Sequence, residues 1–241
     1  QVHCKDENLT ELMETAAKGL NLLPHCVSHS GVKIAGPGDI EGHVGHDGRY
    51  YIIDFGRVMP AEAPPKDPKK RAQDPRGVFY KFLRREFVAF TYPTSGGEPL
   101  CSDAFTAWDN MSDLEVAKAH ANGVYRATKY LKKVTIPAFA KQIEHSFKTG
   151  EILTPMLVKT AAAKVNVDPT DDDQQFSFTS GLRGSRLVST KNSSHTIVRS
   201  SSRPIFYQSN VADMRRIMKK YVCAELLHAY GINCRHIGLV R

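Results

Sequence analysis

Five side chains of metal-binding type fall within residues 41–57, EGHVGHDGRYYIIDFGR: Glu41, His43, His46, Asp47 and Asp54. Carboxylates and imidazoles are common ligands of divalent cations. Side chains alternate between the two faces of a strand, so Glu41 and His43 share a face while His46 and Asp47 fall at the turn. Because this placement separates the five side chains, we expect them to stabilise the turn or to be solvated at the surface, and not to bind a metal.

A second set of metal-type residues lies near the end of the chain, at Cys223, His228, Cys234 and His236. On a helix the five-residue step from Cys223 to His228 is a rotation of about 500°, which leaves the two side chains near opposite sides. Neither a C-x-x-C nor an H-x-x-x-H spacing is present. We therefore predict no metal and no cofactor, and interpret Cys223 as a small core residue.

Residues Ile53 to Gly56 form the tetrapeptide IDFG, which resembles the magnesium-binding motif of kinases, lipid kinases in particular. That chemistry needs an Asn as second ligand and a Lys on another lobe. No glycine-rich loop and no HRDxxxxN motif precede Asp54, and no GxSxG elbow occurs. We expect a structural Asp54 paired with Arg57 or Arg84, the three forming a polar centre in a protein that is not an enzyme. A kinase-like nucleotide-binding enzyme or pseudo-enzyme that uses Asp54 is the alternative.

The chain is basic, with 33 Lys and Arg against 25 Asp and Glu, a net charge of +8 and a pI near 9.2. This balance suits RNA, ribosome or anionic lipid surfaces as partners, and equally a solvated surface without a polyanion. Basic runs on helices, around Lys132 and Arg216, are interpreted as solvated faces. Tyr50, Tyr51 and Phe55 could stack on bases, but we expect them to pack in the hairpin core. Two loop clusters supply the candidate RNA contacts: Lys66, Lys69, Lys70, Arg71, Arg76, Arg183 and Arg186.

The local patterns predict a β-hairpin with strands at residues 40–44 and 50–58 and an Asp47-Gly48 turn, in which both central residues take positive φ. The second strand is apolar on both faces, which favours burial under helices. An amphipathic helix precedes the hairpin, capped by Asp6 or Asn8 and ended by Gly19. The fold class is α+β: a mostly helical domain with a central antiparallel hairpin and short additional strands, for which a kinase C-lobe-like arrangement is one possibility.

Further helices are expected after the hairpin. One apolar face runs from Phe79 to Phe90, and a longer helix begins at Ser112, in a capping box with Glu115, and continues to residue 133. Pro137 starts or kinks the next helix, which ends before residue 150, and another begins near residue 154. The last helix ends at Gly231 and is followed by a short strand. Residues 60–77 read as a solvated loop and residues 166–209 as a low-complexity insertion within one domain spanning 1–241.

The five cysteines are an odd number without a framework spacing, which favours a reducing compartment, and we expect a cytoplasmic protein. No apolar run approaches the ~18 residues needed to span a bilayer, and no leader pattern is present. The first residue is Gln1 and the last residues are apolar, so we expect a fragment of a larger protein.

Five blocks, in order, resemble the Clu (clustered mitochondria) domain. They are GPGDIEGHVGHDGRYYIIDFGRVMP, FYKFLRREFV, PLCSDAF, TKYLKKVTIPAFAKQIEH and ELLHAYGINCRHIGLV. The resemblance implies the Clu domain of a large cytosolic eukaryotic protein, with helical repeats following it. It further implies a role in mitochondrial distribution and in binding mRNAs that encode mitochondrial proteins. We accordingly expect a non-catalytic scaffold with RNA or ribosome-associated partners, protein partners and an indirect association with mitochondria. The loops at 60–77 and 166–209 depart from the family pattern.

Overall fold

The computed structural model describes residues 2, 4–27, 31–109, 113–149 and 224–240. All of these belong to one compact unit, formed by residues 1–169 and 221–241; a second unit, residues 170–220, lies outside the described residues. The expected insertion at 166–209, the helix from residue 154 and most of the last predicted helix also lie outside them. In the described part of the chain, no helix is long and apolar enough to cross a membrane.

The N-terminal helix α1, Glu7–Gly19, begins as predicted at Asp6, whose carboxylate accepts a hydrogen bond from the Leu9 amide at 2.9 Å. The helix ends at Gly19 as predicted, but Gly19 is not left-handed, and the positive φ falls at Asn21, at 55°. The Asn21 side-chain amide donates a hydrogen bond to the carbonyl of Val88, 67 positions along the chain, at 3.1 Å. A left-handed asparagine is therefore held in place by a tertiary contact that a local pattern does not reveal.

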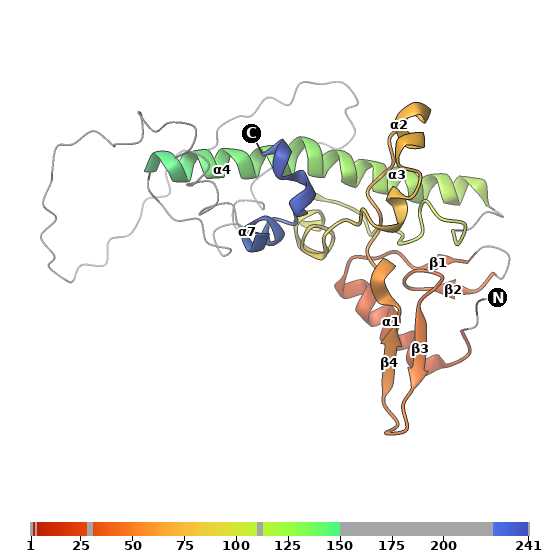
Figure 1. The fold of residues 1–241 in the computed structure, drawn as a ribbon. Helices are drawn as coiled ribbons and strands as arrows, with labels where there is room; N and C mark the ends of the chain where they lie inside the picture. The colour runs from red at the N-terminus through yellow and green to blue at the C-terminus, as the bar shows by residue number, and fades with distance from the viewer. Residues whose placement is uncertain (1, 3, 28–30, 110–112, 150–223, 241) are drawn as a thin grey trace, which may run out of the picture. The chain divides into compact units, whose positions relative to one another are not determined.

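Two small antiparallel hairpins make up the sheet structure of the described residues. Strands β1, His25–Cys26, and β2, Lys33–Ile34, form the first. Strands β3, Glu41–Val44, and β4, Tyr50–Ile53, form the second, with Glu41 opposite Ile53. Figure 1 shows β3 and β4 extending next to α1, and Asn8 of α1 donates to the Tyr50 hydroxyl at 3.2 Å.

The second hairpin corrects three predictions. Of the residues in the turn only Gly48 has a positive φ, 73°, and its amide donates to the carbonyl of Gly45 at 2.9 Å. This is a type I turn followed by a left-handed glycine rather than a turn with two positive φ values. The second strand ends at Ile53 rather than at residue 58. No residue of β3 or β4 is buried, so the expected burial of this hairpin under helices is wrong.

After β4 the chain forms short elements. A 3₁₀ helix, Phe55–Arg57, precedes helix α2, Pro68–Gln73, which lies within the segment expected to be a loop. Asp67 caps α2 by accepting from the Lys69 amide, and Pro68 occupies the first helical position, where no amide is needed. The predicted helical face from Phe79 to Phe90 is also corrected. It is divided into a 3₁₀ helix, Gly77–Phe79, a bridge between Phe82 and Ala61, and a π-helical turn, Phe87–Thr91.

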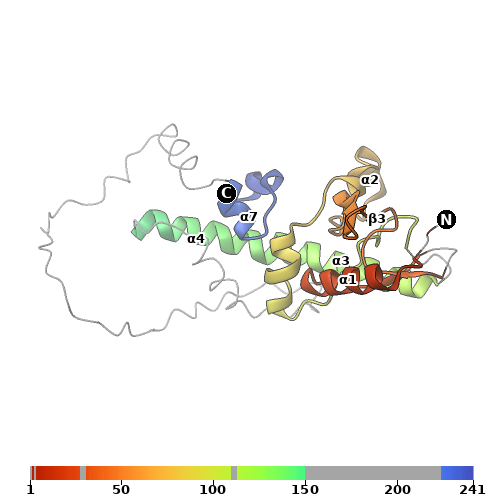
Figure 2. The ribbon, with the colours of Figure 1, turned by 90° about the horizontal axis from the view of Figure 1, so that it is seen from below.

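Helix α3, Leu114–Tyr130, continues through a π-helical turn, Leu131–Thr135, into helix α4, Ile136–Thr149. Figure 2 shows α3 and α4 following one another along a single direction. The cap of α3 is Asp113, which accepts from the amides of Glu115 and Val116, rather than Ser112. Pro137 lies in the first turn of α4, as predicted, and its missing amide explains why the backbone widens just before it.

The core lies where the C-terminal segment meets α4 and the π-helical turn at Phe87–Thr91. The Phe139 and Tyr230 rings are 4.5 Å apart, and Phe87 stacks on Tyr92 at 5.6 Å. Helix α7, Ala224–Ala229, ends at Gly231 with φ 72°, as predicted. The expected strand after it is instead a 3₁₀ helix, Cys234–Leu239, capped by Asn233. The α+β class is confirmed, with mixed helices and two small hairpins.

Candidate nucleic-acid interface

The basic cluster predicted at residues 66–76 is on the surface. Its segment carries five Lys and Arg and two Asp, and its basic residues are all exposed. Three of them, Lys69, Lys70 and Arg71, lie on α2, and Lys70 and Arg71 fall in its last turn. Cations at the C-terminal end of a helix are stabilised by the helix dipole, so Lys70 and Arg71 favour the helical conformation of α2.

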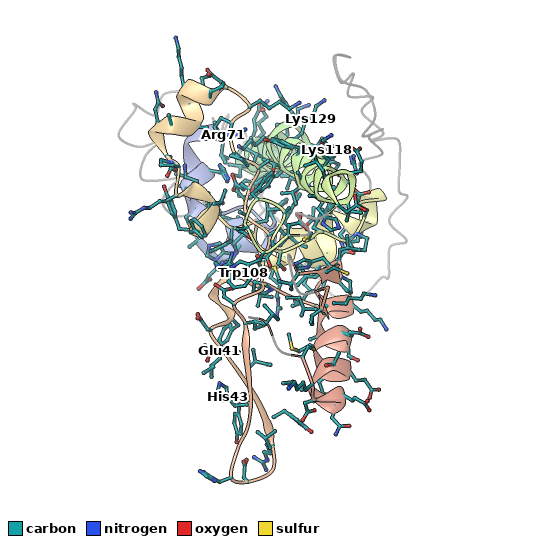
Figure 3. All side chains as sticks on the ribbon, turned by 90° about the vertical axis from the view of Figure 1, so that its right-hand side faces the viewer. Glu41, His43, Arg71, Trp108, Lys118 and Lys129 are labelled. Carbon is teal, nitrogen blue, oxygen red and sulfur yellow. The ribbon has the colours of Figure 1, made fainter. Side chains whose placement is uncertain are left out.

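This segment is attached to α3. The amide of Ala63 donates to the Thr128 hydroxyl at 2.9 Å, and the Lys66 ammonium lies 5.6 Å from the centre of the Tyr125 ring. Figure 3 shows Arg71 on α2 and Lys118 and Lys129 on α3. These contacts attach the chain just before α2 to α3.

A groove of about 760 Å³ lies between α1, β4 and residues 80–86, and most of its lining side chains are apolar. Phe55 and Tyr80, with 65% and 57% of their surface exposed, line it together with Arg84 and Arg85. The Tyr80 hydroxyl donates to the Asp74 carboxylate at 2.6 Å, which ties the rim of the groove to the basic segment. Sequence reasoning missed this groove, because it placed residues 79–90 on one helical face. The expectation that Tyr51 and Phe55 pack in a hairpin core is likewise wrong, since both side chains are exposed.

Asp74 neutralises part of the local charge. Hydrogen bonds from Lys81 and Tyr80 hold the pKa of its carboxyl below the usual range, and the same contact raises the pKa of Lys81. Lys81 is therefore engaged within the protein. Lys69, Lys70 and Arg71 have exposed side chains that can reach phosphates.

The predicted polar centre is rearranged. Arg57 makes a two-pronged hydrogen bond to the Asp39 carboxylate at 2.6 and 2.7 Å, and Arg84 pairs with Glu86 at 3.1 Å. Both arginines thus have partners other than Asp54. Asp54 is exposed in a left-handed conformation, with φ 54° and ψ 40°, so it caps nothing in the following 3₁₀ helix.

Arg57 also reaches the carboxylate of Asp103 at 3.4 Å, and Asp103 is fully buried. Burial on its own lowers the pKa of Arg57, but the hydrogen bond to Asp39 and the nearby Asp103 charge outweigh it and raise the pKa. Asp103 additionally accepts from the Gly38 amide at 2.7 Å and from the Thr106 hydroxyl at 2.9 Å. The buried acid that organises this region is therefore Asp103, in the block PLCSDAF, and not Asp54.

A second buried carboxylate, Glu62, joins the chain before α2 to the C-terminal segment. It accepts hydrogen bonds from His236 at 2.6 Å and from Arg235, and Lys132 lies at 3.7 Å. Burial by itself raises the pKa of Glu62, but the His236 hydrogen bond and the three cationic neighbours outweigh it and lower the pKa. Lys132, interpreted from sequence as part of a solvated face, has a buried partner.

The metal-type residues of the second hairpin are dispersed, as predicted. Glu41 and His43 lie on the same strand face, where Figure 3 labels them. His43 Nε2 is 3.4 Å from Glu41 Oε2, and both side chains are exposed. Asp47 instead accepts from the Tyr51 hydroxyl at 2.7 Å and from the Arg49 amide at 3.1 Å. Turn chemistry accounts for Asp47, and this hydrogen bonding holds its pKa below the usual range.

Among the C-terminal residues, Cys234 Sγ lies 3.4 Å from His228 Nε2, whereas His236 is bound to Glu62. Cys223, Arg183, Arg186 and Arg216 lie outside the described residues, and so does the SGLRGSR stretch.

The structure also brings together three residues that sequence reasoning did not connect: Cys101, Asp109 and His120. His120 Nδ1 lies 2.7 Å from Asp109 Oδ1, and both side chains are almost fully buried. Burial is the main cause that raises the pKa of the Cys101 thiol far above its ordinary value. Their spacing of 8 and 11 residues matches no standard ligand pattern, so the sequence carried no usable signal for this cluster.

No solved structure matches the chain. The family model described as CLU, Clustered mitochondria, matches residues 1–64, a range that contains α1, both hairpins and the start of the segment leading to α2. The resemblance to the Clu (clustered mitochondria) domain inferred from the sequence is confirmed by this match over residues 1–64.

Proposed function

We propose that residues 1–241 are a Clu-type domain from a larger cytoplasmic protein, and that the domain is a non-catalytic RNA-binding module. In this proposal it contacts mRNAs for mitochondrial proteins and supports mitochondrial distribution, with protein or ribosome-associated partners. The association with mitochondria is then indirect. The match over residues 1–64 supports the family part of the proposal.

The observation that carries the RNA part is the pair of exposed rings, Phe55 and Tyr80, on the groove, together with the hydrogen bond that ties Tyr80 to Asp74 of the basic segment. Proteins that bind single-stranded RNA combine a basic surface with exposed aromatic rings on which bases stack. Such rings cost free energy when left in water, and a stacked base covers them. A purely solvated basic surface does not need two half-exposed aromatic side chains beside it.

A fluorescent single-stranded RNA titrated with the protein at low and at moderate salt tests this proposal. We expect binding that weakens steeply with salt, because each phosphate contact releases a counterion. The triple variant Lys69→Gln, Lys70→Gln, Arg71→Gln should bind more weakly and show a smaller salt slope. A matched triple variant, Lys133→Gln, Lys141→Gln, Lys148→Gln, removes the same charge from the π-helical turn and α4 and should bind nearly as the parent does. Absent binding at low salt, or equal loss in both triple variants, contradicts the proposed interface.

The non-catalytic part rests on Asp54. Asp54 is exposed with a left-handed backbone, and among the described residues it belongs to no group of three or more His, Cys, Asp and Glu side chains that could hold a metal ion. ATP with Mg²⁺ should leave the melting temperature unchanged. A rise in melting temperature that Asp54→Asn abolishes would instead favour the kinase-like alternative.

A further inference from the structure

Cys101, Asp109 and His120 each offer one ligand-type atom, and these atoms lie within 4.8 Å of one another. Cys101 and Asp109 are 1% and 2% exposed, and the His120 side chain is 9% exposed. Cys101 and Asp109 lie on the two sides of the turn that contains Asp103, and His120 comes from α3. The cluster therefore joins this turn to α3 through three side chains of different chemistry.

A second imidazole lies beside the cluster. The His25 ring is 6.3 Å from the His120 ring, edge to face, and its side chain is fully buried. His25 Nε2 is held by the Asp103 carboxylate at 3.2 Å, whereas no described residue bonds to His25 Nδ1. A carboxylate on one ring nitrogen is the usual arrangement behind a metal-ligating histidine, because it fixes the tautomer and leaves the other nitrogen open.

We propose that Cys101, Asp109 and His120 bind one divalent cation of the zinc class, with His25 Nδ1 as the fourth ligand. One sulfur, two imidazole nitrogens and one carboxylate oxygen form a donor set that Zn²⁺ accepts in four-coordinate protein sites. Such a cation ties β1 and the Cys101–Asp109 turn to α3, in addition to the contact between the Phe105 and Tyr125 rings, whose centres lie 5.4 Å apart.

Binding requires small local adjustments and the movement of two protons. Two ligand atoms on the same zinc lie about 3.3 Å apart, given bonds of about 2.0 Å. The 2.7 Å hydrogen bond between Asp109 Oδ1 and His120 Nδ1 is therefore replaced as the cation enters, and the Nδ1 proton of His120 moves to its Nε2. The Cys101 S–H bond breaks as the Zn–S bond forms, and its proton leaves to solvent.

The same three residue types occur in cysteine nucleophile triads, but burial disfavours that use here. A reactive cysteine is partly exposed and carries a lowered pKa. Cys101 is almost fully covered, and burial shifts its pKa in the opposite direction. A substrate carbonyl cannot reach this sulfur, whereas a small cation can.

The test uses the full chain, treated with a chelator and then titrated with Zn²⁺ against a chromophoric competitor, and separately with Co²⁺. We expect one equivalent bound per chain, release of a proton from the thiol, a thiolate-to-cobalt charge-transfer absorption and a higher melting temperature. Absence of stoichiometric binding, or a Co²⁺ complex without thiolate absorption, overturns the proposal.

Variants assign the ligands. Cys101→Ser and His120→Gln should weaken Zn²⁺ binding at least a hundredfold, and His25→Gln at least tenfold. Cys4→Ser and the double variant His228→Gln, Cys234→Ser are the matched controls, because these residues lie outside the cluster, and they should retain binding. Because Cys101 is buried, its variant is first checked for folding by circular dichroism. If it does not fold, the ligand assignment is tested by the Zn²⁺ affinities of His120→Gln and His25→Gln and by the Co²⁺ spectra of the controls. Loss of the thiolate absorption in a control overturns the assignment.

Discussion

The Glu62 carboxylate and the His236 imidazole, 174 positions apart in the chain, are joined by a 2.6 Å hydrogen bond in the buried interior. Arg235 donates to the same carboxylate and to the carbonyl of Phe82 at 2.8 Å. The segment after α7 is thereby fixed to the chain that leads from the second hairpin to α2. This one acid holds the C-terminal segment against the chain around residue 62.

Replacement of Glu62 by Gln should destabilise the fold by about 1–3 kcal/mol at neutral pH, because the buried His236 and the partly exposed Arg235 lose a charged hydrogen-bond acceptor. The folded-state pKa of Glu62 lies below the usual 4.5, so its contribution is complete above about pH 4.5 and is lost as the pH falls through the folded-state value. Urea unfolding at several pH values measures this. The difference in the free energy of unfolding between the parent and Glu62→Gln should become smaller below pH 4.5. A difference that does not depend on pH would contradict the proposed ion pairing.

The Asp103→Asn variant should lose about 3 kcal/mol of unfolding free energy, since Asp103 is fully buried and faces Arg57 and His25. Asp54→Asn is the control: Asp54 is exposed, and asparagine tolerates its left-handed backbone. That control should change stability by less than about 0.5 kcal/mol. Thermal and urea unfolding compare the two. Equal effects would show that Asp103 does not organise this region.

Gly231→Ala should destabilise the protein by about 3 kcal/mol. Its φ of 72° is unfavourable for alanine, and the added Cβ would lie 2.5 Å from the backbone of Phe87. Gly19→Ala adds the same methyl group within α1, where nothing lies within 4 Å. It should stabilise the protein by about 0.5–1 kcal/mol through helix propensity. Differential scanning calorimetry should show the two melting temperatures moving in opposite directions.

Phe55→Ala and Tyr80→Ala should each weaken single-stranded RNA binding by about 1–3 kcal/mol, the usual value of one base stacked on an aromatic ring. Tyr51→Ala is the matched control, because Tyr51 is exposed on β4 and does not line the groove. Fluorescence anisotropy at one fixed salt concentration measures all three affinities. If only Tyr51→Ala lost RNA affinity, the bases would stack on the second hairpin and not in the groove.

Local patterns predicted several boundaries correctly: the Asp6 cap, the position of the second hairpin, the Pro137 start of α4 and the Gly231 stop of α7. Each depends on a few neighbouring residues whose backbone preferences act over one turn. Among the predictions that failed, one depends on burial. The apolar second strand was expected in the core, whereas the structure leaves β4 half exposed beside the groove.

The pairing of charged side chains likewise separates what the sequence determines from what only the tertiary structure determines. Sequence alone determined that the chain resembles the Clu domain, that it is basic and that Arg57 belongs to a polar centre. Only the tertiary structure decided that Arg57 pairs with Asp39 and Asp103, that Glu62 pairs with His236, and that Cys101 lies with Asp109 and His120. Turn and cap preferences act between residues a few positions apart, so they can be read along the chain. A buried charge takes whichever counter-charge the packing of distant segments brings within about 4 Å, and linear spacing does not contain that information.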